Sequence, residues 1–315
     1  MARVVVLGAS LTDMNLRLPQ LPAAGETRLG GTFFMGPGGK GANQAIAARR
    51  AGAEVVLLTA FGDDELSRRL IEHDRAEGID LDHAKIVAGR ASGVALILVG
   101  EDGENLIGVA PGPNADYGPD DVDRLPDSVF KAGGVLLASL EVPLAAVDRA
   151  IRRAKAAGMM VVLNPAPADA GLLNSDLLRF VDVLTPNAVE LRTLAAGPPP
   201  DGADGTWRAT RDLFARGLAR AVVTLGAEGC VVAEADPESH RRIPAYRAEV
   251  VDTVGAGDAF NAVLAVALAE GLPIFEAARR AAAAGALAVG RPGAQGALPS
   301  RSEIDAVLIS ELDPT

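Results

Sequence analysis

The sequence is poor in cysteine and has no long apolar runs. A single cysteine among 315 residues, Cys230, excludes a disulfide framework, and its setting in GCVVA indicates a buried, unreactive thiol. The opening MARVVVLGAS is too short an apolar run for a signal peptide, and no stretch approaches the roughly 20 apolar residues of a membrane span. We therefore expect a soluble, cytoplasmic protein with no membrane partner.

Positive charge is also scarce. Lys and Arg number 30 against 41 Asp and Glu, which gives a formal net charge of −11. The closest approach to a basic run, RAIRRAK (149–155), is typical of the solvated face of one helix. A nucleic-acid binder is expected to have a basic face, so we do not expect this protein to bind nucleic acid.

What the sequence does contain is an alternation of apolar, β-branched runs with helical patterns. Strands are predicted at 3–9, 54–62, 133–139, 159–167, 180–187 and 220–233, and helices at 38–52, 63–78, 143–158 and after Asp258. Strands that are apolar throughout and separated by amphipathic helices are typical of a sheet buried on both sides. We predict an α/β fold with a mainly parallel central sheet and helices on both faces.

Two segments break this alternation. Residues 14–35 and 91–110 have the pattern of strands and hairpins without helices, with GEDGEN (100–105) as a hairpin turn. We expect them to form a small β-sheet lid over the carboxyl ends of the core strands. Residues 1–13, 36–90 and 111–315 would then form the α/β core, with AAGPPPDGADG (195–205) as a surface loop.

The stretch DTVGAGDAF (252–260) combines a glycine turn with an acid at the start of an apolar helix. Such a turn leaves main-chain N–H groups free to hold an anion, and the helix dipole favours negative charge there. The Asp258 carboxylate could take a proton from a hydroxyl held beside that site, as phosphoryl transfer to an alcohol requires. From the spacing alone, a simple helix cap by Asp258 is the alternative.

A second glycine cluster, GPGGKGANQA (36–45), matches neither a Walker A loop nor a dinucleotide fingerprint. Gly38 and Gly39 allow a ligand to approach the main chain, and Lys40 and Asn43 offer donors at the start of a helix, which suits a hydroxyl-rich ligand. A tight turn with a solvent-facing lysine is the alternative.

Acids and amides also follow several predicted strands: Asp13, Glu141, Asn187 and Glu190. Ligands of open α/β sheets bind beyond the carboxyl ends of the strands, so these positions form a site if the fold brings them to one edge. Asn187 and Glu190 could orient a hydrated Mg²⁺.

The segments GGKGANQA (38–45) and DTVGAGDAF (252–260) resemble the two signatures of the ribokinase family of carbohydrate kinases. PAAGET, AFGDDE, LLASLEVPL, LNPAPA, TPNAVEL and VVTLGAEGCVV follow in the family's order, so the resemblance covers essentially the whole chain. It implies a three-layer sandwich with a lid that commonly pairs with a second subunit, here a homodimer. It also implies transfer of the γ-phosphoryl group of ATP to the 5-hydroxyl of D-ribose.

The resemblance assigns roles to individual residues. Asp258 would be the general base, and the N–H groups of Gly255, Ala256 and Gly257 the anion hole. The sugar would be held by Asp13, Gly39, Lys40, Asn43, Glu141 and Asp258. The nucleotide would lie along Asn187, Thr224, Gly226, Gly229 and Gly257, with Mg²⁺ held through water by Asn187 and Glu190. A monovalent cation, K⁺, would be held by Asp252 and by main-chain oxygens at Val254, Val289, Pro292 and Ala294.

Three positions depart from the family pattern. Leu11 stands where many members have an asparagine that donates to the sugar, and apolar residues occur here in deoxyribose kinases, so 2-deoxyribose or another small sugar or nucleoside is the alternative acceptor. Ala282 and Ala297 replace polar residues near the adenine or the cation, which predicts a weaker dependence on K⁺. A catalytically silent sugar-binding regulator is disfavoured because Asp258 and its glycine turn are intact.

Overall fold

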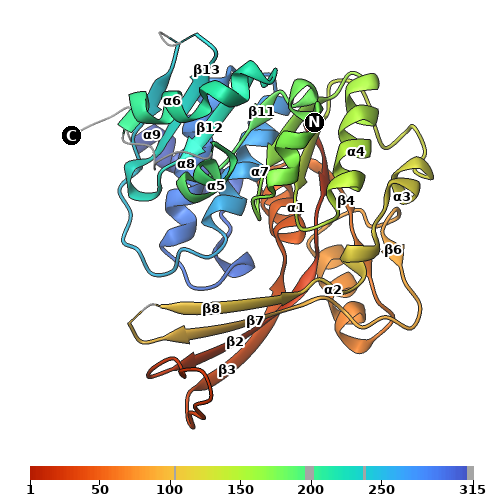
Figure 1. Ribbon diagram of the computed structural model, residues 1–315, viewed down its shortest axis with the longest axis vertical. Coiled ribbons are helices and arrows are strands. Elements are labelled where there is room, and N and C mark those ends of the chain that lie inside the picture. Colours follow the sequence, from red (N-terminus) through yellow and green to blue (C-terminus); the bar gives the residue numbers. More distant parts are fainter. Residues whose placement is uncertain (103, 196–201, 237–238, 311–315) are drawn as a thin grey trace.

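The central sheet lies in the middle of the molecule. The computed structural model describes residues 1–102, 104–195, 202–236 and 239–310 (Figure 1). In these ranges the sheet has eight strands in the order β14-β13-β12-β11-β10-β9-β1-β4. Their bounds are β1 (Arg3–Leu7), β4 (Glu54–Leu58), β9 (Val135–Ser139), β10 (Met160–Asn164), β11 (Val183–Leu184), β12 (Arg220–Thr224), β13 (Cys230–Glu234) and β14 (Arg241–Ile243). All neighbouring strands pair in parallel except β12 with β13 and β13 with β14, so β13 alone runs in the opposite direction, which confirms the predicted mainly parallel sheet.

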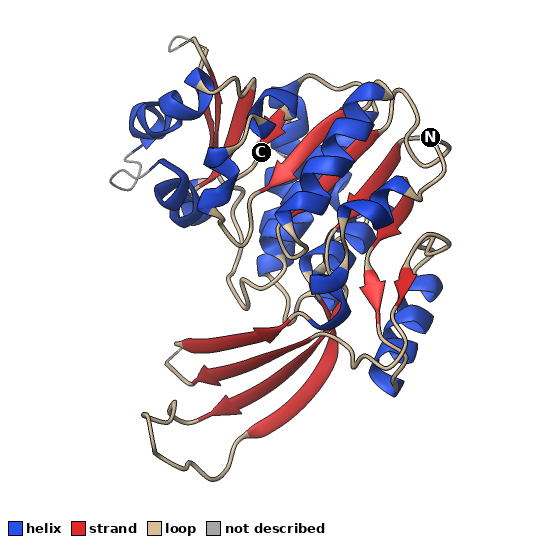
Figure 2. Ribbon diagram, turned by 45° about the vertical axis from the view of Figure 1, so that its right-hand side comes forward, coloured by secondary structure: helices blue, strands red, loops and turns tan. Residues whose placement is uncertain are grey.

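Helices cover both faces of this sheet (Figure 2). One face carries α1 (Lys40–Arg50), α7 (Ala256–Ala269), α8 (Ile274–Val289) and α9 (Arg301–Ser310), with α2 (Glu65–Ala76) at its edge. The other face carries α3 (Pro119–Asp123), α4 (Leu144–Ala156), α5 (Ala188–Ala195) and α6 (Gly202–Ala215). Strand β1 shows why both faces must be covered, since Val4 and Val6 enter one core cluster while Val5 and Leu7 enter the other.

Helix α7 is the most buried helix near the sheet's centre. Its residues from Asp258 to Leu268 are all buried, and it packs against α1 and α8. A helix that is apolar on every side is stable only when it is enclosed on every side. The first turn of α7, which carries Asp258, is therefore held on a rigid support.

A second, four-stranded sheet projects from the core in the order β3-β2-β7-β8 (Figure 1). Its strands are β2 (Leu11–Leu18), β3 (Thr32–Gly38), β7 (Val94–Gly100) and β8 (Asn105–Ala110), and a small pair is formed by β5 (Ala60–Phe61) and β6 (Lys85–Ile86). Strands β7 and β8 are antiparallel, as expected for a hairpin, although residue 103 of its turn lies outside the described residues. Strand β2 begins at Leu11, so Leu11 and Asp13 belong to this sheet and not to a loop after β1.

One loop prediction is partly wrong. Helix α6 begins at Gly202, so 202–205 are helical, and 196–201 lie outside the described residues. Among the described residues, no helix is both long enough and apolar enough to span a membrane.

Candidate active site

A cavity of about 710 Å³ opens between the two sheets. It collects most of the residues singled out in the sequence: Asp13, Gly39, Lys40, Asn43, Glu141, Asn187, Glu190, Thr224, Val254, Gly255, Gly257 and Asp258 all line it. These residues come from segments as far apart as β2 and α7, so the fold gathers them as expected for ligands beyond the carboxyl ends of parallel strands.

The glycine turn before α7 is built for close approach. Gly255, the residue that caps α7, has φ = 79°, and a Cβ there would lie 3.1 Å from the main chain of Ala294. Both facts require glycine. The N–H of Ala256 makes only a long bond of 3.4 Å to the Thr253 carbonyl, and those of Gly255 and Gly257 have no acceptor within the described residues. These N–H groups at a helix start suit an anion.

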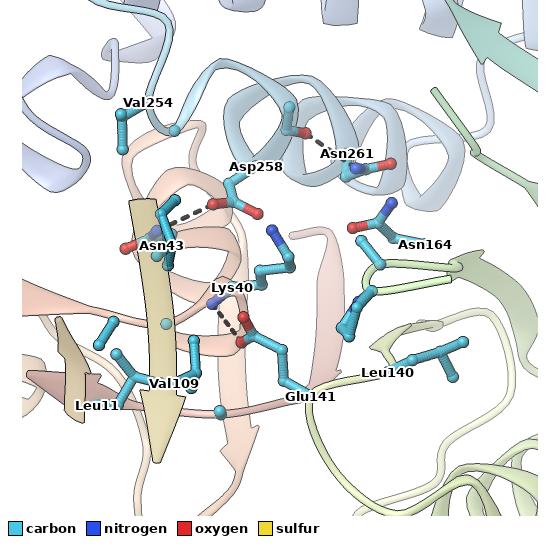
Figure 3. A pocket seen from close by; sticks show the side chains of 18 of the residues that line it. Leu11, Lys40, Asn43, Val109, Leu140, Glu141, Asn164, Val254, Asp258 and Asn261 are labelled. Carbon is cyan, nitrogen blue, oxygen red and sulfur yellow. Dashed lines mark hydrogen bonds between the residues drawn. The ribbon is translucent and has the colours of Figure 1, made fainter. Parts of the chain in front are cut away.

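Asp258 does not cap its helix. Its Oδ2 accepts a hydrogen bond from Asn43 Nδ2 at 2.9 Å (Figure 3). Its Oδ1 accepts one from Gln44 Nε2 at 3.0 Å. The side chain is 7% exposed and lies on the wall of the cavity. The capping alternative is therefore wrong, since the carboxylate faces α1 and the cavity.

Lys40 is not a solvent-facing turn residue. Its main-chain N–H donates to Glu141 Oε2 at 2.7 Å, and its side chain extends between Glu141 and Asp258 (Figure 3). Burial alone would lower the pKa of Lys40, but the carboxylates around it, Asp258, Glu141, Glu190 and Asp13, outweigh burial and raise it. The lysine is thus the cation at the centre of an acidic cavity.

Burial raises the pKa of each acid around Lys40. The pKa of Glu141 rises to about 7, with the Lys40 charge opposing the rise. The pKa of Asp13 rises to about 6 through burial and the nearby Asp258 charge. Burial also raises the pKa of Asp258, against the Lys40 charge and the amide N–H groups of Asn43 and Gln44. With these pKa values, Glu141 and Asp13 change protonation near neutral pH.

Asn187 and Glu190 lie together at one end of the cavity. The Asn187 main-chain N–H and side-chain amide donate to the two oxygens of Glu190 at 2.8 and 2.9 Å. Burial raises the pKa of Glu190. A carboxylate oxygen keeps a lone pair after accepting one bond, so this pair fits outer-sphere contact with a hydrated Mg²⁺.

Asp252 joins two loops beside the glycine turn. Its Oδ1 accepts from the Val254 N–H at 3.0 Å and its Oδ2 from the Gly293 N–H at 2.9 Å. Carboxylate and carbonyl oxygens are a donor set that suits a hard cation. Val289 differs from the expectation, because its carbonyl accepts the N–H groups of Val251 and Asp252 and has no free lone pair for a cation.

Several residues predicted to hold the nucleotide or the monovalent cation do not line this cavity. Thr224, at the end of β12, reaches the cavity, but Gly226 and Gly229 follow in the next turn and do not line it. At Gly229, φ is 88° and a Cβ would lie 2.1 Å from the Ile243 carbonyl oxygen, so glycine there has a packing reason. Ala256, Pro292 and Ala294 also lie outside the lining of this cavity.

Sequence reasoning missed three amides. Gln44 bonds Asp258, while Asn164, at the end of β10, and Asn261, in α7, line the cavity. The available signal was a glutamine within the buried face of α1 and an asparagine ending an apolar strand. Neither pattern indicates a partner until the segments are brought together.

One wall of the cavity is apolar. It is formed by residues of the four-stranded sheet, Leu11, Ala95, Ile97, Ile107 and Val109, while Leu140 lines the cavity from the loop after β9. Leu11 is 3% exposed and packs with Ala9 and Ala95 in a small core cluster. A bound sugar would therefore meet polar groups on one side and hydrocarbon on the other.

Comparisons with known proteins agree with this geometry. The model of the pfkB family of carbohydrate kinases matches residues 1–301. The chain is 35% identical to a ribokinase of Haemophilus influenzae over 300 residues, which are 95% of this chain and 96% of that protein. It is also 35% identical to a deoxyribokinase of Salmonella typhi over 305 residues, 97% of this chain and 98% of the relative. The structure of Arabidopsis thaliana ribokinase complexed with ribose and ATP matches with a TM-score of 0.85 and 30% identity, covering 98% of this chain and 99% of that one, which confirms the predicted fold.

Proposed function

Because the chain belongs to the pfkB family of carbohydrate kinases and is a ribokinase-type sugar kinase, we propose that it phosphorylates the 5-hydroxyl of D-ribose with ATP. The observation that carries the proposal is the buried Asp258 carboxylate beside the N–H groups of Gly255 and Gly257, which have no acceptor within the described residues, on the wall of the cavity. A base next to an anion site is the arrangement that phosphoryl transfer to an alcohol needs. Since ATP is the co-substrate, we place the reaction in the cytoplasm.

In the proposed step, Asp258 accepts the proton of the sugar hydroxyl as its oxygen forms a bond to the γ-phosphorus. The bond from that phosphorus to the β-phosphate oxygen breaks, and ADP leaves. The N–H groups of Gly255, Ala256 and Gly257 stabilise the charge on the transferring phosphoryl group without rearrangement. Asp258 must be ionised to act, and the Lys40 charge favours that form.

The polar wall of the cavity supplies the sugar contacts in this proposal. Asp13 and Glu141 would accept hydroxyl protons, and Gly39, Lys40 and Asn43 would complete the set. The buried Asn43 Oδ1 has no partner within the described residues, so it is free to accept from a hydroxyl. The nucleotide would lie toward Asn187 and Thr224, and for Gly226 and Gly229 we propose only a contribution from the shape of their turn.

Two ions belong to the proposal. Asn187 and Glu190 would hold Mg²⁺ through water, and the metal would neutralise charge on the nucleotide phosphates. Asp252 with main-chain oxygens at Val254, Pro292 and Ala294 would hold K⁺ beside the glycine turn. Activity should be lost when Mg²⁺ is chelated, while omission of K⁺ should have the smaller effect.

A second acceptor, 2-deoxyribose, is favoured by one observation. Leu11 presents a hydrocarbon side chain to the cavity where a donor to a hydroxyl would otherwise lie. An apolar neighbour suits a sugar that lacks a hydroxyl, although an apolar contact discriminates less than a hydrogen bond does.

We also propose that the four-stranded sheet is a lid and that it pairs with a second copy of the chain. The strand register separates its two faces, with Asp13, Ala95 and Val109 facing the cavity. The outer face carries Met14, Leu16, Phe33, Met35, Leu96, Leu98 and Leu106. Phe33 and Leu106 are 60% and 53% exposed, and a contiguous apolar sheet face of this kind marks an interaction surface.

The test is ADP release by the purified protein with ATP, Mg²⁺ and K⁺, with ribose and 2-deoxyribose offered in parallel. A preference for ribose supports the first acceptor, and a preference for 2-deoxyribose supports the second. Turnover with neither sugar would overturn both acceptors and direct the search to nucleosides and other hydroxyl compounds.

A further inference from the structure

The catalytic carboxylate is held by a side chain that does not touch the cavity. Gln44 is fully buried in α1 and is absent from the lining of the cavity, unlike its neighbour Asn43. Its Nε2 donates to Asp258 Oδ1 at 3.0 Å and to Asn164 Oδ1 at 3.1 Å. An amide nitrogen has two hydrogens, so both are used. Gln44 therefore reaches the base from the side opposite to any bound sugar.

The orientation of the Gln44 amide is fixed by a second amide, that of Asn164. Asn164 Nδ2 donates to the Thr185 main-chain carbonyl at 3.1 Å, which forces Asn164 Oδ1 to face Gln44. A flipped Gln44 amide would set its oxygen against two acceptors, Asn164 Oδ1 and the Asp258 carboxylate. The chain of bonds thus runs from the main chain after β11, through two amides, to the base.

We propose that Gln44 is a positioning residue that keeps the Asp258 carboxylate ionised and fixes the direction of its reactive oxygen. This inference deepens the proposed function, because it rests on Asp258 acting as the base. Asp258 is buried among other charges: Lys40 from α1, Asp13 from β2, and Glu141 and Glu190 from the loops and helix beyond β9 and β11. Burial disfavours the ionised form of Asp258, while the Lys40 charge and the two amide donors, Asn43 and Gln44, favour it.

The hydrogen bonds from Asn43 and Gln44 to Asp258 have different roles in this proposal. Asn43 lines the cavity, so its bond to Oδ2 lies on the side where a sugar enters. Gln44 holds Oδ1 from behind, so its bond can persist through the reaction. Removal of Asn43 should therefore affect sugar binding, whereas removal of Gln44 should affect turnover.

The test is a pair of variants at one position, Gln44→Met and Gln44→Glu, each assayed for kcat and KM across pH. Methionine keeps the length and removes both donors. Glutamate keeps the shape but places a second carboxyl against Asp258, and two carboxyls in contact hold a shared proton. We expect kcat at pH 7 to fall about tenfold or more in Gln44→Met, because a hydrogen bond to a charged group is lost. The acidic limb of the pH–kcat profile should move upward by about one pH unit, and further in Gln44→Glu, with KM for the sugar within about threefold.

Ile46→Val is the matched control, since Ile46 is a fully buried residue of the same helix in the apolar core. It should lower the melting temperature and leave the pH profile in place. A Gln44→Met profile that matches Ile46→Val, or a rise in KM with kcat unchanged, would overturn the inference and leave Gln44 as a packing residue.

A second readout separates this inference from the proposed function. The Asp258 side-chain carboxyl can be followed by ¹³C NMR titration of protein labelled at aspartate, with its signal assigned by its absence in Asp258→Asn. Its midpoint should rise in Gln44→Met, with or without a known acceptor sugar. An unmoved midpoint would refute the role of Gln44 even in an active kinase. Wild-type protein inactive with every sugar, but with a shifted midpoint in the variant, would refute the kinase substrate and support the positioning.

Discussion

Replacement of Leu11 by asparagine should convert the apolar wall of the cavity into a hydroxyl-binding one. Leu11 is 3% exposed and packs with Ala9, Ala95 and the partly buried Ile97. With 2-deoxyribose bound, an asparagine there would be left without a partner, which costs about 1–3 kcal/mol. With ribose, a bond to the additional hydroxyl would contribute about 0.5–1.5 kcal/mol. The difference in transition-state binding between the two sugars should therefore change by about 2 kcal/mol or more in favour of ribose. The ratio of kcat/KM for ribose to that for 2-deoxyribose should then rise about thirtyfold.

The assay is ADP release under conditions that give kcat/KM for each sugar separately. Leu11→Ala is the control, because it removes the hydrocarbon bulk without adding a hydrogen-bonding group. Both variants should lose stability, since truncation or polar replacement of a buried leucine costs about 2–5 kcal/mol, so melting temperatures must be compared first. If Leu11→Asn leaves the ratio of the two sugars where Leu11→Ala leaves it, Leu11 does not face the hydroxyl that distinguishes them.

Three further predictions test the base, the buried charge beneath the lid and the outer face of the lid. Asp258→Asn should lower kcat by about 10²–10⁴ with the fold retained, and activity near that of the wild type would end the assignment of the base. Burial raises the pKa of Asp74 from 3.8 to about 6, so the folded state loses stability as pH rises through that window. Asp74→Asn should therefore stabilise the fold against chemical unfolding by up to about 3 kcal/mol at pH 8, and give no gain near pH 4. An equal gain at both pH values would contradict burial of the charge as the cause. Leu96→Glu, on the outer face of the lid sheet, should shift the protein from dimer to monomer in light scattering, whereas a wild-type monomer would remove the interface altogether.

The fold was predictable because its rules are local. Strands such as β1 and β9 are apolar on both faces, and α2 carries its own boundaries, with Asp64 accepting a bond from the Ser67 N–H at its start and Gly78 after its end. Boundaries failed where tertiary pairing decides them. Leu11 and Asp13 look like a loop after β1, but the pairing of Asp13 with Gly36 and Ala95 extends β2 through them.

The site was predictable where a motif, or a position directly after a predicted strand, marks its residues. The glycine turn and Lys40 stand out because glycine, which is unfavourable within helices, immediately precedes the start of a helix at both places. Gln44 and Asn164 do not, because their roles depend on a hydrogen bond across 120 residues of chain. No periodicity or spacing encodes such a contact, and a buried glutamine in a helix has many uses. The family resemblance implies which residues would contact ligands, but not which residues hold those residues in place.

The acidic cluster around Lys40 destabilises the folded state, because its carboxyl groups are buried. Burial raises the pKa of Asp13, Glu141 and Asp258 together, so each must be ionised against the preference of the fold at pH 8. One lysine cannot offset three buried carboxylates on its own. The amide donors at Asp258 and the Lys40 main-chain N–H at Glu141 supply part of the difference, and hydroxyl groups of a bound sugar would supply more. Sugar binding should therefore stabilise the protein more at pH 8 than at pH 5, because the ionised carboxylates of the cluster lack hydrogen-bond donors that the sugar hydroxyls would provide.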